Sequence, residues 1–455
     1  MHQPNILFIG IGGIGMSAIA RYFITKGTQV FGYDKTPSSL TTQLIAEGAD
    51  IIFDEHWPDV FQHLNPNNCM VIYTPAIPSQ NNLLKHAEKH GFVMLKRSEA
   101  LGLITRSEKS IGVAGTHGKS TTSTMLAYLL SNTNHGCNAF LGAISTNFNS
   151  NFVTADQASW TVVEADEFDR SFLQLSPFAS IVTTVDPDHL DVYTNEEKFV
   201  EGFRQYTMKI DPQGVLVLHH GIKLPSICRQ VTYSLDTNEA HYFGYDLSET
   251  EAGISFSLRT PTETYHHVVI GIHGRHNAEN AIGCLALCQE LGIDVSKVLP
   301  FFSYFKGIKR RFEIIYQHEK LTYIDDYAHH PTEIRCLIQS VREMFPNKKI
   351  TGVFQPHLFT RTQDFGDGFA LELSKLDRLI LLPIYPAREL PINGIDSTWL
   401  LSKIKLGQKM LVQPSELLQQ LRSVDEGVLL TIGAGDIDRF VDSIHDLLLA
   451  KEVSS

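Results

Sequence analysis

The stretch that most constrains this chain runs from Ile111 to Thr122 and reads IGVAGTHGKSTT. Its apolar start predicts a short buried strand, and the glycines that follow predict a tight turn before a helix begins. Gly112, Gly115 and Gly118 allow the backbone to fold closely around an anion. The amide donors and the dipole of a helix N-terminus favour phosphate at such a position. The stretch therefore predicts a strand, a phosphate-binding loop and a helix, in that order.

Three side chains of the same loop suit a nucleoside triphosphate. Lys119 adds a positive charge, and Ser120 and Thr121 add hydroxyl groups where the helix starts. The general P-loop has a glycine five residues before its Gly-Lys pair, where this chain has Val113. An ordinary glycine turn is the alternative, but the apolar strand before the loop and the apolar helix after it favour a triphosphate site.

Length, charge and hydropathy narrow the class of protein. A chain of 455 residues indicates about three domains. Its net charge of −12 argues against nucleic acid as the main partner, because phosphate backbones require a basic surface. No apolar run approaches the roughly 18 residues that span a bilayer, and the N-terminus enters a strand without a signal peptide. We therefore expect a cytoplasmic protein without membrane insertion.

The cysteines agree with that compartment. They are scattered without a Cys-x-x-Cys pair, which indicates free thiols in the reducing cytosol. Cys284 and Cys288 lie one helical turn apart, but the apolar residues around them predict core positions rather than metal ligands. The six cysteines are Cys69, Cys137, Cys228, Cys284, Cys288 and Cys336.

A second glycine-rich loop opens the chain. A predicted strand, Asn5–Gly10, enters the loop Gly10–Gly15, and Met16–Thr25 predicts the helix after it. Asp34 ends the next strand, where dinucleotide folds place an acid that binds a ribose hydroxyl. The motif alone leaves an NAD or FAD domain open. Further on, Thr74–Pro78 ends a strand at the carboxyl edge, where ligands of such sheets bind, and a plain proline turn is the alternative.

Two acidic loops follow apolar strands downstream of the phosphate loop. The first carries four carboxylates within Glu164–Asp169, and such a cluster is costly to pack without a cation. Mg²⁺ is the expected cation, and Glu164 at the strand tip is its best ligand. The second loop, Asp186–Asp191, directs His189 toward the same site. A solvated acidic turn is the alternative for each loop taken singly.

The middle of the chain holds two further polar segments. Residues from about 210 to 270 are rich in β-branched and aromatic side chains and predict an antiparallel β section. It ends in His273–Asn280, whose imidazoles and amides either cap the helix Ala281–Leu291 or contact an adenine edge. The basic run Lys306–Glu313 predicts a domain junction, where the cations either face solvent or contact a triphosphate.

The last third predicts another α/β unit. Four apolar strands each end in a polar or glycine-rich loop, and the strand C-termini of a parallel sheet share one edge. The loops are therefore expected to converge, and their histidines and arginines suit a carboxylate substrate. The loops are Asp325–Pro331, Gln355–Thr362, Ile384–Glu389 and Gly433–Asp436.

In their order and spacing these motifs resemble the Mur ligase family. They extend over nearly the whole chain, from about residue 5 to about residue 440. The motifs are GIGGIGM, GTHGKST, EADEFDRSF, DHLD, GRHNAEN, KRRFE, DDYAHHPTE, QPHLFTRT and IGAGD. The resemblance favours the diphosphate of a UDP-sugar, rather than NAD, as the ligand of the first glycine loop.

The resemblance implies three α/β domains: an N-terminal Rossmann-like domain, a central P-loop ATPase domain and a C-terminal Rossmann-like domain. The implied bounds are residues 1–107, 108–308 and 309–455. The first domain is expected to bind the UDP-sugar and the second ATP. The third is expected to bind the amino acid and to close on ATP. A monomer or a homodimer is expected.

The resemblance also implies an activity. The members most like this chain use ATP and Mg²⁺ to join L-alanine to the lactyl carboxylate of UDP-N-acetylmuramate in peptidoglycan biosynthesis. ATP first phosphorylates the carboxylate to an acyl phosphate, which the amine of L-alanine then attacks. Catalysis of this kind mainly positions the reactants and neutralises charge.

The family's site residues carry over onto matching motif positions. The UDP-sugar is expected at Gly10, Gly12, Gly13, Ile14, Gly15, Asp34, Thr74, Pro75 and Ala76. ATP is expected at Gly115, Thr116, His117, Gly118, Lys119, Ser120, Thr121, His276, Asn277, Asn280, Arg311 and Asp326. The amino acid is expected at Tyr327, His329, His357 and Arg361.

The resemblance also assigns metal ligands and catalytic groups. Ser120 and Glu164 are expected on one Mg²⁺ and His189 on a second. The expected catalytic residues are Lys119, Glu164, His189 and His329. Whether His329 or its neighbour His330 acts as a base or only binds is left open.

Some positions depart from the family pattern. Leu358 stands where some relatives have Arg, and Phe168 and Arg170 stand where others have smaller residues. These departures leave the shape of the acceptor pocket open. No lysine matches the carbamylated lysine of sibling ligases.

Two other functions remain as alternatives. A recycling ligase that attaches an intact tripeptide to UDP-N-acetylmuramate is the nearest, although the QPHLFTRT motif favours alanine. A dinucleotide-dependent oxidoreductase is the alternative from a different class. It would require NAD at Gly10–Gly15.

Overall fold

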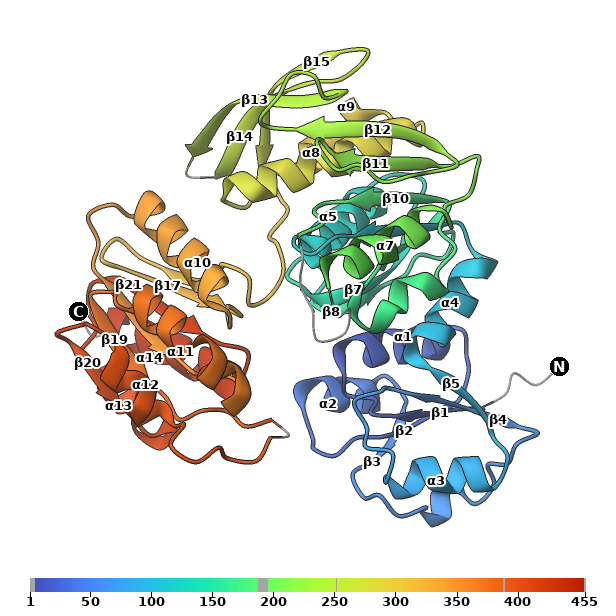
Figure 1. Cartoon of the computed structure of the whole chain (residues 1–455), viewed down its shortest axis with the longest axis horizontal. Helices are drawn as coiled ribbons and strands as arrows, with labels where there is room; N and C mark the ends of the chain where they lie inside the picture. Colours follow the sequence, from blue (N-terminus) through green and yellow to red (C-terminus); the bar gives the residue numbers. More distant parts are fainter. Residues whose placement is uncertain (1–4, 187–194, 251, 388, 454–455) are drawn as a thin grey trace. The chain divides into compact units, whose positions relative to one another are not determined.

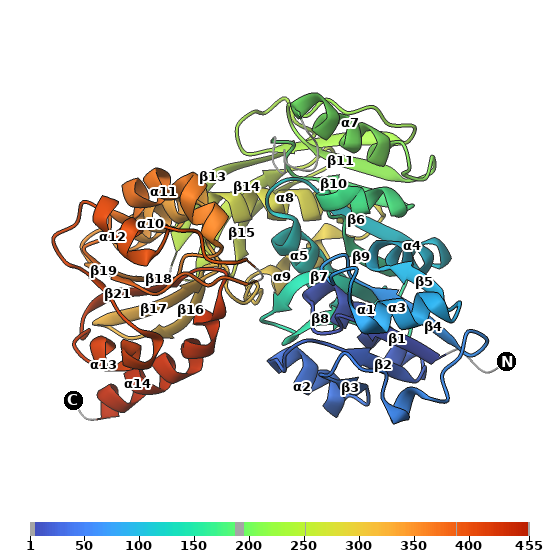
Figure 2. The same ribbon diagram turned by 60° about the horizontal axis from the view of Figure 1, so that its bottom comes forward.

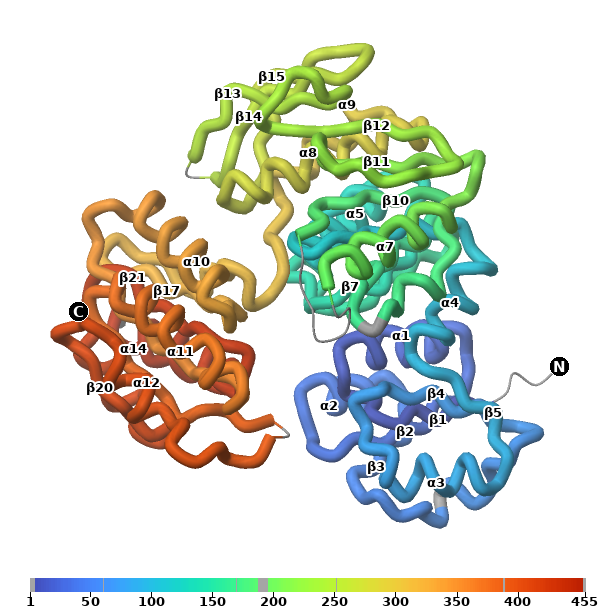
Figure 3. Tube along the Cα trace, in the orientation of Figure 1, coloured from blue at the N-terminus to red at the C-terminus, as the bar shows by residue number. Residues whose placement is uncertain are grey.

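Three β-sheets organise the chain and follow one another along the sequence. The computed structural model describes residues 5–186, 195–250, 252–387 and 389–453. The trace runs from the blue N-terminal sheet through the central sheet to the orange and red C-terminal sheet (Figure 3). Two compact units result: Met1–Ile308 holds the first two sheets and Lys309–Ser455 the third (Figure 1). The predicted three-part α/β fold class is confirmed.

The first sheet has five parallel strands in the order β3-β2-β1-β4-β5. Its strand β1 is buried after the first residue, because the sequence NILFI carries only apolar side chains from Ile6 onward. The strands are β1 (Asn5–Ile9), β2 (Val30–Tyr33), β3 (Asp50–Ile52), β4 (Cys69–Tyr73) and β5 (Val93–Lys96). The helices are α1 (Ile14–Thr25), α2 (Ser39–Ala46), η1 (Asp59–Phe61), α3 (Asn82–Lys89) and α4 (Arg97–Ser107).

The central sheet has ten strands in the order β15-β14-β13-β12-β11-β10-β6-β9-β7-β8. The strands are β6 (Ser110–Ala114), β7 (Cys137–Ser145), β8 (Ser150–Val153), β9 (Trp160–Glu164), β10 (Ala179–Val182), β11 (Val215–His219), β12 (Arg229–Ser234), β13 (Tyr242–Thr250), β14 (Gly253–Arg259) and β15 (Thr264–Ile270). The helices are α5 (Lys119–Ser131), η2 (Phe168–Gln174), α7 (Glu196–Thr207), α8 (Arg275–Glu290) and α9 (Val295–Phe302).

The prediction of an antiparallel section from 210 to 270 is wrong for its first half. Strand β11 pairs in parallel with β10 and with β12, and β12 pairs in parallel with β13. Only β13, β14 and β15 form the antiparallel meander. The apolar run of β11 is typical of a strand buried on both faces, which parallel sheets require.

Helices α5 and α8 lie side by side and both pack on the central sheet (Figures 1 and 2). Close packing joins them, since the Cys284 thiol contacts the Thr122 carbonyl at 3.5 Å. Cys284 and Cys288 are both fully buried and free, which confirms their prediction as core residues. The helix that begins at the phosphate loop is thus held against the helix that carries the predicted adenine contacts.

A buried polar network joins α1 of the first sheet to β8 of the central sheet. Arg21 is 5% exposed and donates to Glu47, at 2.8 Å, and to the amide oxygen of Asn151. The amide nitrogen of Asn151 in turn donates to the Ile14 carbonyl and, at 2.8 Å, to the Ser17 hydroxyl. Every polar atom of this buried amide is satisfied, so the network specifies how α1 lies against β8.

Replacing Asn151 with alanine is expected to lower the free energy of unfolding by about 1–3 kcal/mol, because it leaves buried donors unpaired. Thermal unfolding of the full-length chain measures the change as a fall in Tm. Asn134→Ala, at an exposed position, is the matched control and is expected to leave Tm unchanged. Equal Tm values for the two variants would contradict the role given to the network.

The third sheet has six strands in the order β16-β17-β21-β18-β19-β20, and only β16 runs antiparallel to its neighbour. Its four central strands are the four that the sequence predicted. The strands are β16 (Glu313–Gln317), β17 (Leu321–Asp326), β18 (Ile350–Phe354), β19 (Arg378–Leu381), β20 (Lys409–Leu411) and β21 (Gly427–Ile432). The helices are α10 (Pro331–Met344), α11 (Phe359–Leu373), α12 (Ser397–Lys403), η3 (Pro414–Glu416), α13 (Leu417–Leu421), η4 (Asp436–Phe440) and α14 (Val441–Val453).

Within the described ranges, no helix combines the length and the apolar character that a bilayer crossing requires.

Candidate active site

The phosphate loop turns between β6 and α5 on two glycines with positive φ. Gly115 has φ +135°, and a Cβ there would lie 2.1 Å from the Thr183 hydroxyl oxygen. Gly118 has φ +80° and is the N-cap residue of α5, with Asn280 of α8 directly beside it. A side chain at either position would be strained in φ and would clash. Gly115 and Gly118 therefore shape the loop, as predicted. The prediction is wrong for Gly112, which lies inside β6, where a side chain would clash with Tyr206.

The segment that follows β10 holds the loop in place. The Thr183 hydroxyl donates to the carbonyls of Ala114 and His117. The His117 amide donates to the Thr184 hydroxyl at 2.9 Å. The Thr116 hydroxyl donates to the Asp186 carbonyl at 2.8 Å. The second acidic segment thus lies against the phosphate loop, whereas His189 lies outside the described residues.

Lys119 is folded into the loop rather than extended into solvent. Its ammonium group donates to the Gly115 carbonyl at 2.7 Å and lies 2.8 Å from both carboxylate oxygens of Glu167. The Glu167 side chain is 0% exposed and that of Lys119 is 13% exposed. Burial raises the pKa of Glu167, and the charge of Lys119 opposes this rise. Glu167 was among the acidic residues noted in the sequence, but its pairing with Lys119 was not predicted.

Glu164 ends β9 next to the start of α5. Its Oε2 accepts a hydrogen bond of 3.1 Å from the Gly142 amide, and a Cβ on Gly142 would lie only 2.1 Å from that oxygen. Desolvation raises the pKa of the Glu164 carboxyl, while Lys119 and the Ser120 hydroxyl lower it. A carboxylate and a hydroxyl at a phosphate loop are hard oxygen ligands of the kind that Mg²⁺ prefers. The residues present therefore fit the predicted metal.

Helix α8 begins at Arg275, six residues before the predicted start at Ala281. His276, Asn277 and Asn280 consequently lie within its first two turns, and Asn280 borders the phosphate loop. Among the described residues, no side chain caps the helix at Gly274, and the Asn277 amide instead donates to the His273 carbonyl at 2.6 Å. Asn is a weak helix former that favours caps and turns, which explains why the sequence suggested a later start.

The carboxyl ends of β11 and β12 add a cluster that the sequence did not predict. His219, Asp236 and Glu279 place one ligand atom each within 4.8 Å of one another. The His219 ring bonds Glu279 at 2.9 Å, which raises the pKa of His219 and lowers that of Glu279. Arg275 pairs with Asp236 at 2.6 Å. The cluster thus neutralises its own charges.

The first glycine loop ends at the N-terminus of α1, which starts at Ile14 with Gly13 as its N-cap residue. A Cβ on Gly10 would lie 2.5 Å from the Thr74 side chain, so the predicted loop residues and the end of β4 are in contact. The Asp34 carboxylate accepts a 2.8 Å hydrogen bond from the Gly12 amide. Asp34 therefore fixes the loop backbone, in addition to any ligand role. Gly13, Ile14 and Gly15 lie in the α1 N-terminus, and Pro75 and Ala76 follow β4.

In the C-terminal unit, Asp326 ends β17 and organises the loop after it. Its carboxylate accepts from the Phe312 amide at 2.7 Å and from the Ala328 amide at 2.8 Å. Burial nevertheless raises its pKa to about 6. The Arg311 guanidinium lies 5.8 Å from the centre of the Tyr327 ring, and that of Arg310 lies 5.1 Å from it. The predicted ATP and amino-acid residues of this unit are thus neighbours.

Two histidines and an arginine converge at the ends of β17 and β18. The ring centroids of His329 and His357 lie 6.4 Å apart, and Tyr327 packs against His329 at 5.2 Å. The Arg361 guanidinium lies 3.5 Å from the His357 ring nitrogen. Desolvation and the charge of Arg361 lower the pKa of His357 to about 4 and also lower that of His329. These shifts favour the neutral form of both imidazoles, in which one ring nitrogen carries no proton.

Leu358 and Phe168 depart from the family pattern, and the structure shows where each lies. Leu358 is the N-cap residue of α11 with φ +71°, and its amide donates to the Tyr385 carbonyl at 2.9 Å. Phe168 starts η2 and is 45% exposed. Leu358 is thus held by its backbone, and Phe168 places an apolar ring at the surface of the acidic loop.

Comparisons with known proteins identify the family. Three family models match in sequence order: "Mur ligase family, catalytic domain" at residues 5–109, "Mur ligase middle domain" at 113–288 and "Mur ligase, glutamate ligase domain" at 310–435. A UDP-N-acetylmuramate–L-alanine ligase of Porphyromonas gingivalis is 45% identical, covering 98% of this chain and 99% of that protein. The chain belongs to the Mur ligase family.

Solved structures agree with this membership. A UDP-N-acetylmuramate–alanine ligase from Thermotoga maritima matches with a TM-score of 0.83 at 27% identity, covering 99% of each chain. A murein peptide ligase from Psychrobacter arcticus matches in fold, with a TM-score of 0.72 at 21% identity and 98% of each chain covered. The predicted family is confirmed, and each Mur ligase model covers one of the three sheets.

The lowered pKa values in the third domain of this Mur ligase predict a pH-dependent stability. Below the ordinary pKa of 6.5, the unfolded chain binds protons that the folded His357, with a pKa of about 4, does not. The free energy of unfolding is therefore expected to fall as the pH drops from 6.5 toward 4. For this partly exposed ring we expect a loss of about 1–2 kcal/mol.

Urea unfolding of the full-length chain at pH 7 and pH 5 measures this loss. His357→Gln is expected to lose less stability than the wild-type chain over the same interval. His318→Gln, at an exposed histidine of the same unit, is the control and is expected to keep the wild-type dependence. A His357→Gln variant with the full wild-type loss would contradict the assignment.

Proposed function

We propose that this Mur ligase joins L-alanine to the lactyl carboxylate of UDP-N-acetylmuramate, using ATP, in peptidoglycan biosynthesis. The observation that carries the proposal is the 45% identity to a UDP-N-acetylmuramate–L-alanine ligase over essentially the whole of both chains. ATP transfers its γ-phosphoryl group to a carboxylate oxygen, and ADP leaves. The amine of L-alanine then attacks the carbonyl carbon of the acyl phosphate, and phosphate leaves.

The phosphate loop has the groups that the first step needs. The residues from Gly115 to Thr121 contact the phosphates, and Lys119 balances the charge that develops as the γ-phosphoryl group moves. Opening the Lys119–Glu167 ion pair frees the ammonium group for the triphosphate. His276, Asn277 and Asn280 contact the nucleotide from α8. Arg311 and Asp326 of the C-terminal unit serve the same nucleotide.

Magnesium is the cofactor that we propose for this step. Ser120 and Glu164 are its ligands, and the desolvation of the Glu164 carboxyl beside the Ser120 hydroxyl supports the assignment. When bound, the ion supplies charge neutralisation for the transferring phosphoryl group. His189, in the second acidic loop, is proposed as the ligand of a second ion.

The second step needs a deprotonated amine and a bound carboxylate. Arg361 suits the carboxylate of L-alanine, because a guanidinium binds carboxylates through two parallel hydrogen bonds. Tyr327 and His357 complete that site. We propose His329 as the group that receives the proton of the attacking amine, supported by its lowered pKa, which keeps the ring neutral.

The first domain is proposed to hold the UDP-sugar. Gly10–Gly15, Asp34 and Thr74–Ala76 are proposed to bind the UDP-sugar, and family membership favours this ligand over a dinucleotide. We propose domain bounds after residues 107 and 308, supported by the end of α4 at Ser107 and the unit boundary at Ile308. A cytoplasmic location is supported by the use of ATP and by the six free cysteines.

Phosphate release from ATP tests the proposal, with UDP-N-acetylmuramate as acceptor. L-alanine, glycine, L-serine and a tripeptide are supplied in parallel reactions. Fastest release with L-alanine is the expected result. Release with the tripeptide alone would instead assign the recycling ligase, and no release with any of the four would refute the proposed function.

A further inference from the structure

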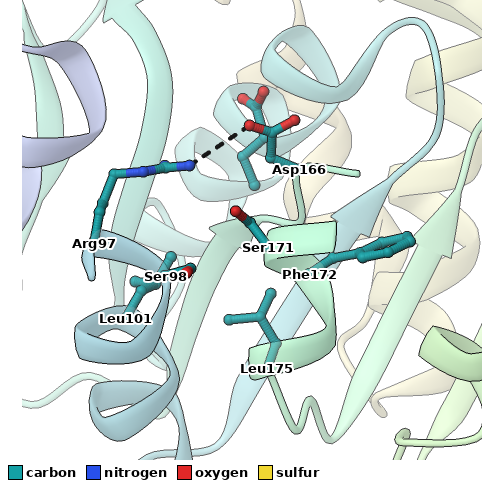
Figure 4. Close-up of a pocket in the computed structure, with 8 residues that line it drawn as sticks. Arg97, Ser98, Leu101, Asp166, Ser171, Phe172 and Leu175 are labelled. Carbon is teal, nitrogen blue, oxygen red and sulfur yellow. Dashed lines mark ion pairs between the residues drawn. The ribbon is translucent and has the colours of Figure 1, made fainter. Parts of the chain in front are cut away.

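Arg97 lies between the first glycine loop and the acidic loop. It is the first residue of α4, directly after β5. A Cβ on Gly15 would lie 2.7 Å from its Nη1 atom, so the guanidinium borders the N-terminus of α1. Its Nη2 atom lies 3.6 Å from the Asp166 carboxylate of the acidic loop (Figure 4). One cation therefore borders both loops.

Arg97 also shares a small pocket with the proposed metal ligand Glu164. Figure 4 shows the guanidinium directed toward the acidic loop and away from the apolar side of the pocket. The lining residues are Arg97, Ser98, Leu101, Glu164, Asp166, Ser171, Phe172 and Leu175. The guanidinium thus lies near two proposed binding sites for anions. One is the first glycine loop, proposed to bind the diphosphate, and the other is the site of phosphoryl transfer at Glu164.

The hydrogen-bonding capacity of this guanidinium is largely unused. A guanidinium offers five N–H donors, and the 3.6 Å approach to Asp166 is too long for a strong hydrogen bond. Among the described residues, no acceptor receives a hydrogen bond from the Arg97 guanidinium. Arg21, by contrast, donates to Glu47, Asn151 and Gln43. Arg97 is 26% exposed, which leaves its donors accessible to a ligand.

We propose that Arg97 binds an anionic group of the acceptor substrate. This rests on the proposed function, and it adds a substrate-binding residue that lies outside the motifs used to assign the site. The anion is either the diphosphate on the glycine loop or the carboxylate that is to be phosphorylated. A carboxylate is planar and a phosphate is tetrahedral, and a guanidinium can bind either group through two N–H donors. Asp166 holds the guanidinium in position before the substrate arrives.

Isothermal titration calorimetry on the full-length protein tests the proposal, with UDP-N-acetylmuramate and with UDP as separate ligands. Arg97→Ala is expected to raise the Kd for UDP-N-acetylmuramate by about 10- to 100-fold, the loss typical of a charged hydrogen-bond pair. Arg97→Lys is expected to lose less, because it keeps the charge. The Kd for ATP is expected to stay unchanged in both variants.

The matched control is Arg106→Ala, at the other end of the same helix. Arg106 is exposed and donates a long 3.4 Å hydrogen bond to the Gln174 carbonyl. This variant is expected to bind both ligands like the wild type. An equal loss of UDP affinity in Arg97→Ala assigns the diphosphate as the bound group. Unchanged UDP affinity assigns the carboxylate.

Two results would overturn the proposal. One is wild-type affinity for UDP-N-acetylmuramate in a folded Arg97→Ala variant. The other is loss of the folded state in both Arg97→Ala and Arg97→Lys, since this assigns a structural role. A wild-type protein that binds no UDP-N-acetylmuramate defeats the proposed function together with this inference. Normal wild-type turnover with unaffected Arg97 variants defeats this inference alone.

Discussion

Replacing Lys119 with alanine is expected to reduce ATP-dependent phosphate release by about 10³-fold or more, because it removes the charge that balances the transferring phosphoryl group. The structure adds a second consequence. Lys119 is the ion-pair partner of Glu167, whose side chain is fully buried. The single substitution leaves that carboxylate without its cation, at a cost of about 3–5 kcal/mol unless the group becomes protonated.

A double substitution separates these two effects. Lys119→Ala with Glu167→Gln removes both charges, so the folded state is expected to recover much of its stability while turnover stays lost. Thermal unfolding and phosphate release are measured on the wild type, on Lys119→Ala and on the double variant. Lys209→Ala, at an exposed lysine, is the control for charge alone. Turnover that recovers together with stability in the double variant would show that Lys119 has only a structural role.

The acid partner of Lys119 also illustrates the limit of sequence reasoning. The four carboxylates of the acidic loop were recognised, together with the need for a balancing cation. The sequence does not predict which carboxylate forms the ion pair with Lys119, because the 3₁₀ turn at Phe168–Gln174 determines the direction of each side chain. Glu167 precedes that turn and is buried, whereas Asp166 is directed to Arg97.

Local patterns predicted the elements that carry the strongest periodicity. The strand and glycine turn at Ser110–Gly118 follow from apolar residues beside glycines, and four C-terminal strands follow from apolar runs with polar ends. The start of α8 was missed because Asn277 and Asn280 favour caps and turns by local propensity. Packing of α8 against α5 outweighs that preference. Parallel pairing of β11 and β12 was missed because strand partners lie far apart in the sequence.

Contacts between distant segments account for the rest of the site. The hydroxyls of Thr183 and Thr184 anchor the phosphate loop through bonds to His117, which lies 66 and 67 residues earlier in the sequence. Arg97 joins two loops that belong to different sheets. No local motif predicts the threonine bonds or the contacts of Arg97, because single threonines and arginines are common in any chain. The family resemblance supplied the ligand classes that spacing alone left open.

Replacing Glu164 with glutamine is expected to lower turnover by about 10²- to 10³-fold, because a neutral amide binds and orients a divalent cation poorly. The side chain is nearly isosteric, so the 3.1 Å hydrogen bond from the Gly142 amide can still form through the amide oxygen. Removing a desolvated carboxylate is also expected to leave thermal stability unchanged or slightly raised. The variant therefore separates metal binding from folding.

The Mg²⁺ dependence of phosphate release is the decisive measurement for this variant. Glu164→Gln is expected to need more Mg²⁺ for half-maximal turnover, whereas Asp156→Asn, at an exposed acid in the turn between β8 and β9, keeps the wild-type requirement. High Mg²⁺ is expected to restore part of the lost rate, because mass action compensates for weaker binding. An unchanged Mg²⁺ requirement with reduced turnover would remove Glu164 from the metal site and leave it a positioning role beside Lys119.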